Sequence, residues 1–249
     1  MNIVIPLAGT DKNFERKGDH KALTKVYGKT VIEWIADSRP YDLSKATFVL
    51  LEEHDRRYRI ADRLRAIFGT QLDIVWTRTA TGGAPQSVML CADRIDNDKS
   101  LIIDLPDQYI DFKGLMPFLR QTSADGVIPT FESLYYNRGY MLWDEITGCV
   151  TRVSEKDRIP VSTHSTACVS YFKRGSDFVS AVRSMIVNQR TAANGAYLIS
   201  LAFNELIASG KRVLPFPCEF IATLGSLEGL NCFEQIVRPV KYDLLRGSA

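Results

Sequence analysis

The segment Ile3-Val-Ile-Pro-Leu-Ala-Gly9 has the pattern of a strand that is buried on both faces and ends at a glycine. A charged loop follows it directly, with the sequence Thr10-Asp-Lys-Asn-Phe-Glu-Arg-Lys-Gly-Asp-His-Lys21. Because this loop joins a buried strand to a predicted helix, its backbone N–H groups are placed to meet an anion. Two interpretations stay open here: a loop that closes over a polyphosphate, and a solvated surface loop of mixed charge.

Three further apolar runs continue the pattern, and amphipathic stretches separate them. We predict strands at Ala46–Leu51, Leu72–Trp76 and Leu101–Leu105, a turn and helix at Ala22–Asp37, and helices at Arg56–Phe68 and Pro85–Ile95. Strands that alternate with helices predict a parallel sheet with helices on both faces. Ligands of such sheets bind outside the carboxyl ends of the strands. Three predicted loops lie at that edge, at 9–21, 78–86 and 106–109.

The pattern changes near residue 125, where strands are separated by turns. We predict strands at Gly126–Phe131, Gly139–Trp143, Val150–Glu155 and Ala167–Phe172, with Thr147-Gly148 as a hairpin turn. After these we predict helices at Ser176–Asn188 and Ala196–Ser209, a strand at Arg212–Phe216 and a last helix at Ser226–Val237, which Ser226 would cap. The sequence contains no repeat or linker, and we expect one domain over residues 1–245 with a tail at 246–249.

The composition excludes several classes of protein. Of the 249 residues, 45% are hydrophobic and 24% charged, as in ordinary globular proteins. A net charge of +2 gives no indication of nucleic-acid binding. The five cysteines form no C-x-x-C pair and no disulfide framework. With no signal-peptide pattern and no apolar run of membrane-spanning length, we expect a protein of the reducing cytoplasm.

Two aspartates near the fourth predicted strand are candidate metal ligands. Asp107 follows the strand and would lie at the ligand-binding edge, where it could hold Mg²⁺ together with substrate phosphates. A Pro-Asp turn explains the same residue equally well. Asp104 lies inside the apolar run, and is either a second ligand or a hydrogen-bonded structural aspartate.

Two other segments carry candidate binding residues. Gly82 and Gly83 would let a flat base approach the backbone, and Gln86 could recognise its edge. A tight turn before a helix is the alternative for both glycines. Lys156, in Ser154-Glu155-Lys156, could pair with a phosphate of an acceptor, although most such lysines are solvated.

The order and spacing of these segments resemble the sugar-nucleotidyltransferase family, which includes glucose-1-phosphate thymidylyltransferases and capsule-associated relatives. The resemblance rests on seven segments, at Ile3–Gly9, His20–Trp34, Thr81–Val88, Asp107–Phe112, Tyr171–Phe178, Asn204–Ile207 and Leu224–Glu228. It implies an α/β, Rossmann-like, three-layer αβα (GT-A-like) fold with a mostly parallel central sheet. It also implies a nucleotide-binding half at 1–124 and an acceptor-binding half at 125–245.

The resemblance further implies a reaction. An NTP and a phosphorylated acceptor, such as a sugar phosphate, would give an NDP-linked product and pyrophosphate, with Mg²⁺ as cofactor, in capsule or surface-polysaccharide biosynthesis. By position, Lys21, Asp107 and Lys156 would be catalytic, and Asp107 would bind the metal. The residues matching the nucleotide site are Leu7, Ala8, Gly9, Lys12, Gly82, Gly83 and Gln86. The nucleobase, the acceptor and homo-oligomerisation stay open.

The chain departs from the family pattern at the phosphate loop. The family has A-G-x-G-[ST]-R-F, whereas this chain has Ala8-Gly-Thr-Asp-Lys-Asn-Phe14. Asp11 thus replaces a glycine and Asn13 the arginine that would clamp a phosphate. His20 replaces the proline before the lysine. Loss of one well-placed charge donor costs about 10²–10³ in rate.

Two further departures lie in the second half. Thr223 takes the place of the second metal aspartate, and Ala196 that of an acceptor-binding glutamate. These changes support an alternative, a catalytically impaired relative that binds a nucleotide or sugar phosphate as a regulatory or partner subunit. A glycosyltransferase that uses a ready-made nucleotide sugar is a third hypothesis. Asp104-Leu-Pro-Asp107 lacks the D-x-D spacing which that class usually has.

Overall fold

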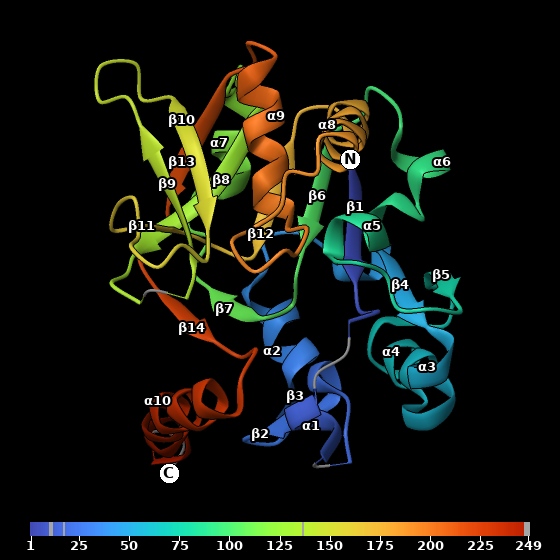
Figure 1. Cartoon of the computed structure of the whole chain (residues 1–249). Coiled ribbons are helices and arrows are strands. Elements are labelled where there is room, and N and C mark those ends of the chain that lie inside the picture. Colours follow the sequence, from blue (N-terminus) through green and yellow to red (C-terminus); the bar gives the residue numbers. More distant parts are fainter. Residues whose placement is uncertain (10–11, 17, 136, 247–249) are drawn as a thin grey trace.

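The computed structural model describes residues 1–9, 12–16, 18–135 and 137–246 (Figure 1). Ten strands of this described part form one sheet in the order β10-β9-β11-β8-β12-β6-β1-β4-β5, with β13 paired to β8. The parallel core consists of β6 (Leu101–Asp104), β1 (Asn2–Pro6), β4 (Thr47–Leu51) and β5 (Asp73–Thr77). The parallel core of the three-layer fold predicted from the sequence is therefore confirmed.

The second half of the chain extends this sheet with mainly antiparallel pairs. Its strands are β8 (Gly126–Glu132), β9 (Gly139–Trp143), β10 (Val150–Glu155), β11 (His164–Thr166), β12 (Val169–Phe172) and β13 (Val213–Pro217). The hairpin predicted at Thr147-Gly148 joins β9 to β10, which pair antiparallel. The strand predicted at Ala167–Phe172 is β12, which pairs with β8 and β6. The preceding strand β11, which pairs with β8 and β9, was not predicted.

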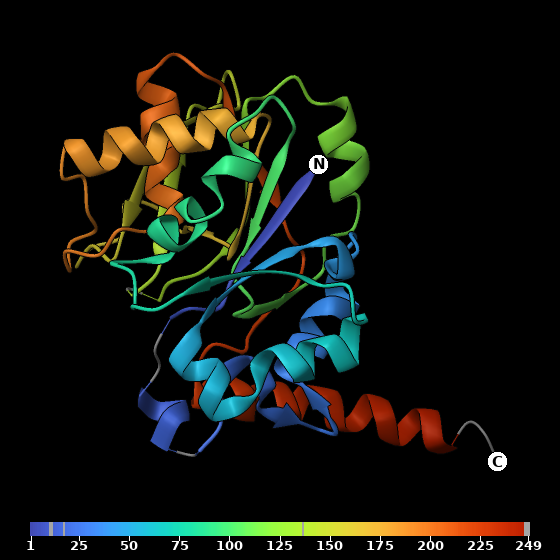
Figure 2. The same ribbon diagram turned by 90° about the vertical axis from the view of Figure 1, so that its right-hand side faces the viewer.

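Alternate residues of the central strands face two separate hydrophobic cores. In β1, Ile3 and Ile5 belong to one core and Val4 to the other. The first core includes residues of α2 (Val31–Ser38), α4 (Ile60–Phe68), α7 (Leu115–Gln121) and α10 (Leu227–Arg246). The second includes residues of α5 (Ala84–Met89), α6 (Ala92–Ile95), α8 (Gly175–Val187) and α9 (Ala202–Ala208). Figure 2 shows α8 and α9 on the opposite side of the sheet from α7.

Several helices are shorter than the sequence predicted. The helix predicted at Arg56–Phe68 is split into α3 (Glu52–Tyr58) and α4, because Arg59 adopts a left-handed conformation with φ 52°. The helix predicted at Ala196–Ser209 is a 3-10 turn, η3 (Ile199–Leu201), followed by α9. The cap predicted for α10 is confirmed, since the Gly229 backbone N–H donates to Ser226 Oγ at 3.0 Å.

Some short elements were not predicted. They are α1 (Lys12–Arg16), α7, β7 (Gln108–Ile110), β11, β14 (Ile221–Thr223) and η2 (Leu43–Lys45). The turn and helix predicted at Ala22–Asp37 are η1 (Lys21–Leu23), the short strands β2 (Lys25–Val26) and β3 (Lys29–Thr30), and then α2. β7 and β14 pair antiparallel, with Gln108 opposite Thr223. This small ribbon brings Thr223 close to Asp107, the residue that precedes Gln108.

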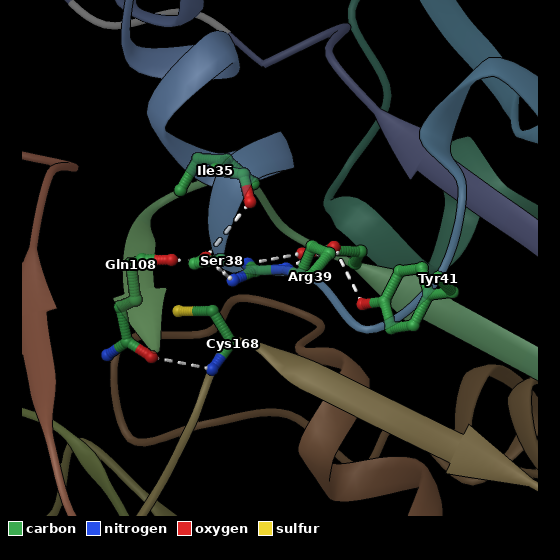
Figure 3. A network of polar contacts seen from close by, with 7 residues as sticks. Ile35, Ser38, Arg39, Tyr41, Gln108 and Cys168 are labelled. Atoms are coloured by element: carbon green, nitrogen blue, oxygen red, sulfur yellow. Dashed lines mark hydrogen bonds and ion pairs between the residues drawn. The ribbon is translucent and has the colours of Figure 1, made fainter. Parts of the chain in front are cut away.

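A fully buried ion pair joins the end of α2 to the end of β6 (Figure 3). Arg39 donates two hydrogen bonds to Asp104, from Nε at 2.6 Å and from Nη2 at 2.8 Å. The Tyr41 hydroxyl donates to the same carboxylate at 2.8 Å, and Arg39 Nη2 also donates to the Gln108 carbonyl at 3.1 Å. Asp104 is therefore the hydrogen-bonded structural aspartate of the two sequence interpretations.

This pair fixes the loop that carries Asp107. On one side of the loop Asp104 is held by Arg39, and on the other side the Gln108 carbonyl accepts from the same guanidinium. The Gln108 side chain accepts from the Cys168 backbone N–H at 2.8 Å (Figure 3). Hydrogen bonds to Arg39 consequently hold the loop on both sides of Asp107, which restricts the position of this residue.

No helix in the described part of the chain is both long enough and apolar enough to cross a membrane.

Replacement of Asp104 by asparagine tests the importance of this pair. The Asp104→Asn variant leaves the Arg39 guanidinium buried without a counter-charge, and we expect the free energy of unfolding to fall by about 3–5 kcal/mol. Urea denaturation followed by circular dichroism measures this change. The exposed pair of Lys29 and Asp37 supplies the control, because Asp37→Asn should cost at most about 1 kcal/mol. Equal losses in the two variants would contradict the assignment.

Candidate functional site

Two adjoining cavities open at the carboxyl ends of the parallel strands. The loop cavity, of about 320 Å³, is lined mainly by residues 6–9, 14–15 and 19–21. The hairpin cavity, of about 420 Å³, is lined by residues at the ends of β9 and β10 and by Thr223. Ala84, Leu105, Asp107 and Leu198 line both cavities and form the wall between them. Both volumes lie within the range of small-molecule sites.

The predicted nucleotide residues are divided between the loop cavity and its surroundings. Leu7, Ala8, Gly9 and Gly83 line the cavity. Gly83 has φ 152°, and a Cβ there would collide with the Tyr197 carbonyl oxygen, so only glycine fits. A side chain at Gly9 would meet open space instead.

Three predicted nucleotide residues are placed differently. Gly82 and Gln86 are not among the residues that line either cavity. The Gln86 side-chain amide lies against the Cα of Gly82, where a Cβ would collide with Oε1. Lys12 begins α1, and its side chain is outside the described part of the structure, as is all of Asp11. Gln86 therefore helps to shape the turn at Gly82.

The structure brings two of the three predicted catalytic residues together. Lys21 Nζ lies 2.6 Å from Asp107 Oδ1, and the two side chains are 24% and 33% exposed. Lys21 lines the loop cavity, while Asp107 belongs to the wall between the two cavities. The ion pair is thus reachable by a ligand from either side.

Lys156, the third predicted catalytic residue, lines the hairpin cavity. It adopts a left-handed conformation with φ 59°, and its backbone N–H donates to the Arg138 carbonyl at 3.1 Å. Its neighbour Glu155 is buried, accepts a short hydrogen bond from Ser200, and has its pKa raised, mainly by burial. Burial therefore favours the neutral carboxyl at Glu155.

His20 and Arg138 were not recognised as site residues from the sequence. His20 is buried in the wall of the loop cavity, with its ring near those of His54 and Tyr58 at 5.8 and 6.1 Å. The Arg138 guanidinium lines the hairpin cavity and donates to Thr223 Oγ1 at 3.0 Å. The replacement of the family proline by His20 was a usable signal. Arg138 offered none, because an arginine beside a hairpin strand is usually solvated.

A metal ion at this site would depend on Asp107. Among the described residues, no group of three or more His, Cys, Asp or Glu is placed to hold a metal. Asp104 is committed to Arg39, and Thr223 carries a hydroxyl in place of a carboxylate. Mg²⁺ is commonly held by one or two carboxylates together with substrate phosphates and water. The accessible carboxylate of Asp107, in the wall between the two cavities, fits that mode.

The two cavities differ in charge. The loop cavity is lined by the carboxylates of Glu15, Asp19 and Asp107 and by the ammonium of Lys21. The hairpin cavity is lined by Arg138 and Lys156, with Glu155 and Asp107 as its carboxylates. Asn13, which takes the place of the family arginine, is exposed in α1 and does not line either cavity.

No protein-family model matches the chain, and no curated protein sequence matches it. Two solved structures resemble it in fold. A nucleoside-diphosphate-sugar pyrophosphorylase from Vibrio cholerae RC9 superposes with a TM-score of 0.79 and 21% identity, over 94% of this chain and 99% of that one. A candidate glucose-1-phosphate thymidylyltransferase from Bacillus anthracis, in complex with sucrose, gives 0.74 and 16%, over 95% of each chain. The chain therefore has the fold of these proteins, as its sequence predicted.

The buried histidine generates a pH-dependent prediction. The pKa of His20 is lowered from 6.5 to about 3, first by burial and then by the charges of His54 and Lys21. In the unfolded chain His20 binds a proton as the pH falls below about 6.5, whereas in the folded chain it stays neutral to about 3. The free energy of unfolding should therefore fall with decreasing pH in this window, with about 1.4 kcal/mol per pH unit due to His20.

Urea denaturation of the native chain and of His20→Gln at several pH values between 7 and 4 measures this contribution. The variant lacks the titrating ring, so its stability should decline less steeply, while the carboxylates contribute equally to both. Parallel curves for the two proteins would show that His20 takes up its proton equally well in the folded state.

Proposed function

We propose that the chain is a nucleotidyltransferase that transfers a nucleotidyl group from an NTP to a phosphorylated acceptor and releases pyrophosphate. The observation that carries the proposal is the ion pair of Lys21 and Asp107 in the wall between two adjoining cavities. A transferase of this kind needs two substrates whose phosphates meet at one point. The pair lies where that point would be if the NTP bound in the loop cavity and the acceptor in the hairpin cavity.

The reaction needs positioning and charge neutralisation more than covalent help. An oxygen of the acceptor phosphate attacks the α-phosphorus, the bond from that phosphorus to the bridging oxygen breaks, and its electrons leave with pyrophosphate. Lys21 would neutralise charge on the α-phosphate, and Lys156 would hold the acceptor phosphate. Bound Mg²⁺, held by Asp107 and the NTP phosphates, would supply further neutralisation of the phosphate charge.

The resemblance in fold supports the proposal. The Vibrio cholerae protein is described as a nucleoside-diphosphate-sugar pyrophosphorylase, and the Bacillus anthracis protein as a candidate glucose-1-phosphate thymidylyltransferase. We extend these activities to this chain as part of the proposal, with a sugar phosphate or a similar compound as acceptor. The proposal also includes a role in capsule or surface-polysaccharide biosynthesis and a cytoplasmic location.

A second candidate is a binding subunit with little or no catalysis. The charge of the loop cavity favours it, because among the residues that the structure describes three lining carboxylates accompany one lysine where a triphosphate would bind. The exposed position of Asn13 agrees with it, since no arginine clamps a phosphate there. If this candidate is correct, NTP binding is measurable by calorimetry without turnover.

Pyrophosphate release separates the two candidates. The chain is incubated with each of the four NTPs, Mg²⁺ and a panel of phosphorylated sugars and polyols, and released pyrophosphate is measured by a coupled assay. We expect release with one pair of substrates and its loss when EDTA removes Mg²⁺. No release with any pair would contradict the proposed function, and NTP binding without release would support the second candidate.

The same assay tests the catalytic pair. Lys21→Met and Asp107→Asn should each lower kcat by about 10²–10³ because each removes a charge at the reacting phosphates. Lys113→Met is the matched control, since Lys113 is an exposed lysine outside both cavities, and it should retain full activity. Retention of activity by Lys21→Met would exclude the proposed role of this residue.

Restoring the family residues tests the phosphate loop. The double variant Asp11→Gly with Asn13→Arg adds the missing clamp and removes a carboxylate. If the chain is the binding subunit of the second candidate function, this variant should release pyrophosphate whereas the native chain does not. An inactive double variant that still binds NTP would show that the loop does not limit the reaction.

A further inference from the structure

Arg138 is held rigidly at the wall of the hairpin cavity. It lies directly before β9, and its guanidinium carbon is 5.3 Å from the ring centre of Phe131 and 5.9 Å from that of Tyr135. Its Nη2 donates to Thr223 Oγ1 at 3.0 Å. Two aromatic rings and one hydroxyl therefore fix the orientation of the guanidinium.

The guanidinium has no carboxylate partner in the described part of the chain. No Asp or Glu oxygen described there lies within ion-pair distance of it, in contrast to Arg39, Arg63 and Arg190. Its Nε is buried and has no hydrogen-bond acceptor. Because Arg138 lines the hairpin cavity and its guanidinium has no counter-charge, it is placed to bind an anion there.

The surrounding cavity leaves this charge uncompensated. Asp107 is paired with Lys21, and the Glu155 carboxyl is buried and accepts a hydrogen bond from Ser200. Lys156 adds a second positive charge to the lining. Two cationic side chains, Arg138 and Lys156, therefore line the hairpin cavity. An acceptor with a single phosphate would need only one of them to pair with that phosphate.

Thr223 preserves the positive charge of Arg138. Its hydroxyl satisfies one N–H donor without supplying a negative charge. An aspartate at this position, as in the family pattern, would lie beside the guanidinium and form an ion pair with it. The threonine thus leaves the positive charge of the Arg138 guanidinium available for a ligand. A planar guanidinium suits carboxylates and phosphates.

We propose that the acceptor carries a second anionic group, a carboxylate or a phosphate, in addition to the reacting phosphate, and that Arg138 binds this second group. The inference rests on the proposed function and names its class of acceptor. Arg138 is then the residue that discriminates acceptors with a second anionic group from those with a single phosphate. A compound without the second group would leave the guanidinium without a counter-charge.

Isothermal titration of the full chain in the absence of nucleotide tests this inference. One set of acceptors is glucose 1-phosphate, glucuronic acid 1-phosphate and glucose 1,6-bisphosphate, which differ only at C6. A second set is glycerol 3-phosphate and 3-phosphoglycerate, which differ by one carboxylate. We expect at least one compound with a second anionic group to bind on the order of 10-fold more tightly than its counterpart with a single phosphate.

Variants at two positions identify the residue responsible. Arg138→Gln should remove the preference, so that the members of a set bind within about threefold of one another. Arg138→Lys, which keeps the charge but lacks the fork, should retain part of it. Thr223→Asp should also lower the preference, because its carboxylate would pair with Arg138. Arg120→Gln, an exposed arginine on α7, is the control and should leave the preference unchanged.

The outcomes that would overturn the inference are distinct from those that would overturn the proposed function. Equal affinities within both sets, no binding of any compound at 10 mM, or a preference that persists in Arg138→Gln would each exclude it. Circular dichroism of each variant establishes that it is folded. A preference that depends on Arg138 without pyrophosphate release would retain this inference and reject the transferase reaction.

Discussion

The buried ion pair of Arg39 and Asp104 is the constraint on which the rest of the site depends. Both side chains are removed from water, so each must find all of its partners inside the protein. Asp104 accepts from Arg39 and Tyr41, and Arg39 also donates to the Gln108 carbonyl. These demands fix the loop between β6 and β7, and Asp107 lies on this loop in the wall shared by both cavities.

Much of the fold was predictable from local patterns, whereas the ion pair was not. Apolar runs such as Ile3–Leu7 are buried on both faces, which is the signature of a central parallel strand. Asp104 was ambiguous because its partner Arg39 is 65 residues away and belongs to the end of a helix. The short strands β7 and β14 were missed for a similar reason, since each has only three residues and is stabilised by contacts with segments far away in the sequence.

The candidate site was predictable in its position but only partly in its chemistry. The rule that ligands bind at the carboxyl ends of parallel strands placed Lys21 and Asp107 near one another, and their ion pair is 2.6 Å long. Arg138 could not be found this way, because its significance depends on the absence of a nearby carboxylate among the described residues.

The two cavities differ in the charge of the side chains that line them. The loop cavity is rich in carboxylates, and the hairpin cavity carries the additional cation. Mg²⁺ bound with an NTP would supply the charge that the loop cavity lacks, while the acceptor would supply the anion that the hairpin cavity attracts.

The central claim is that the ion pair of Lys21 and Asp107 marks the meeting point of two substrates. A crystal structure of the chain with Mg²⁺ and the most tightly bound α,β-methylene NTP analogue tests it most directly. We expect the triphosphate in the loop cavity, with its α-phosphate in contact with Lys21 and Asp107 and the hairpin cavity open for the acceptor. A nucleotide bound outside the loop cavity, or with its phosphates over Arg138 and away from Asp107, would contradict it.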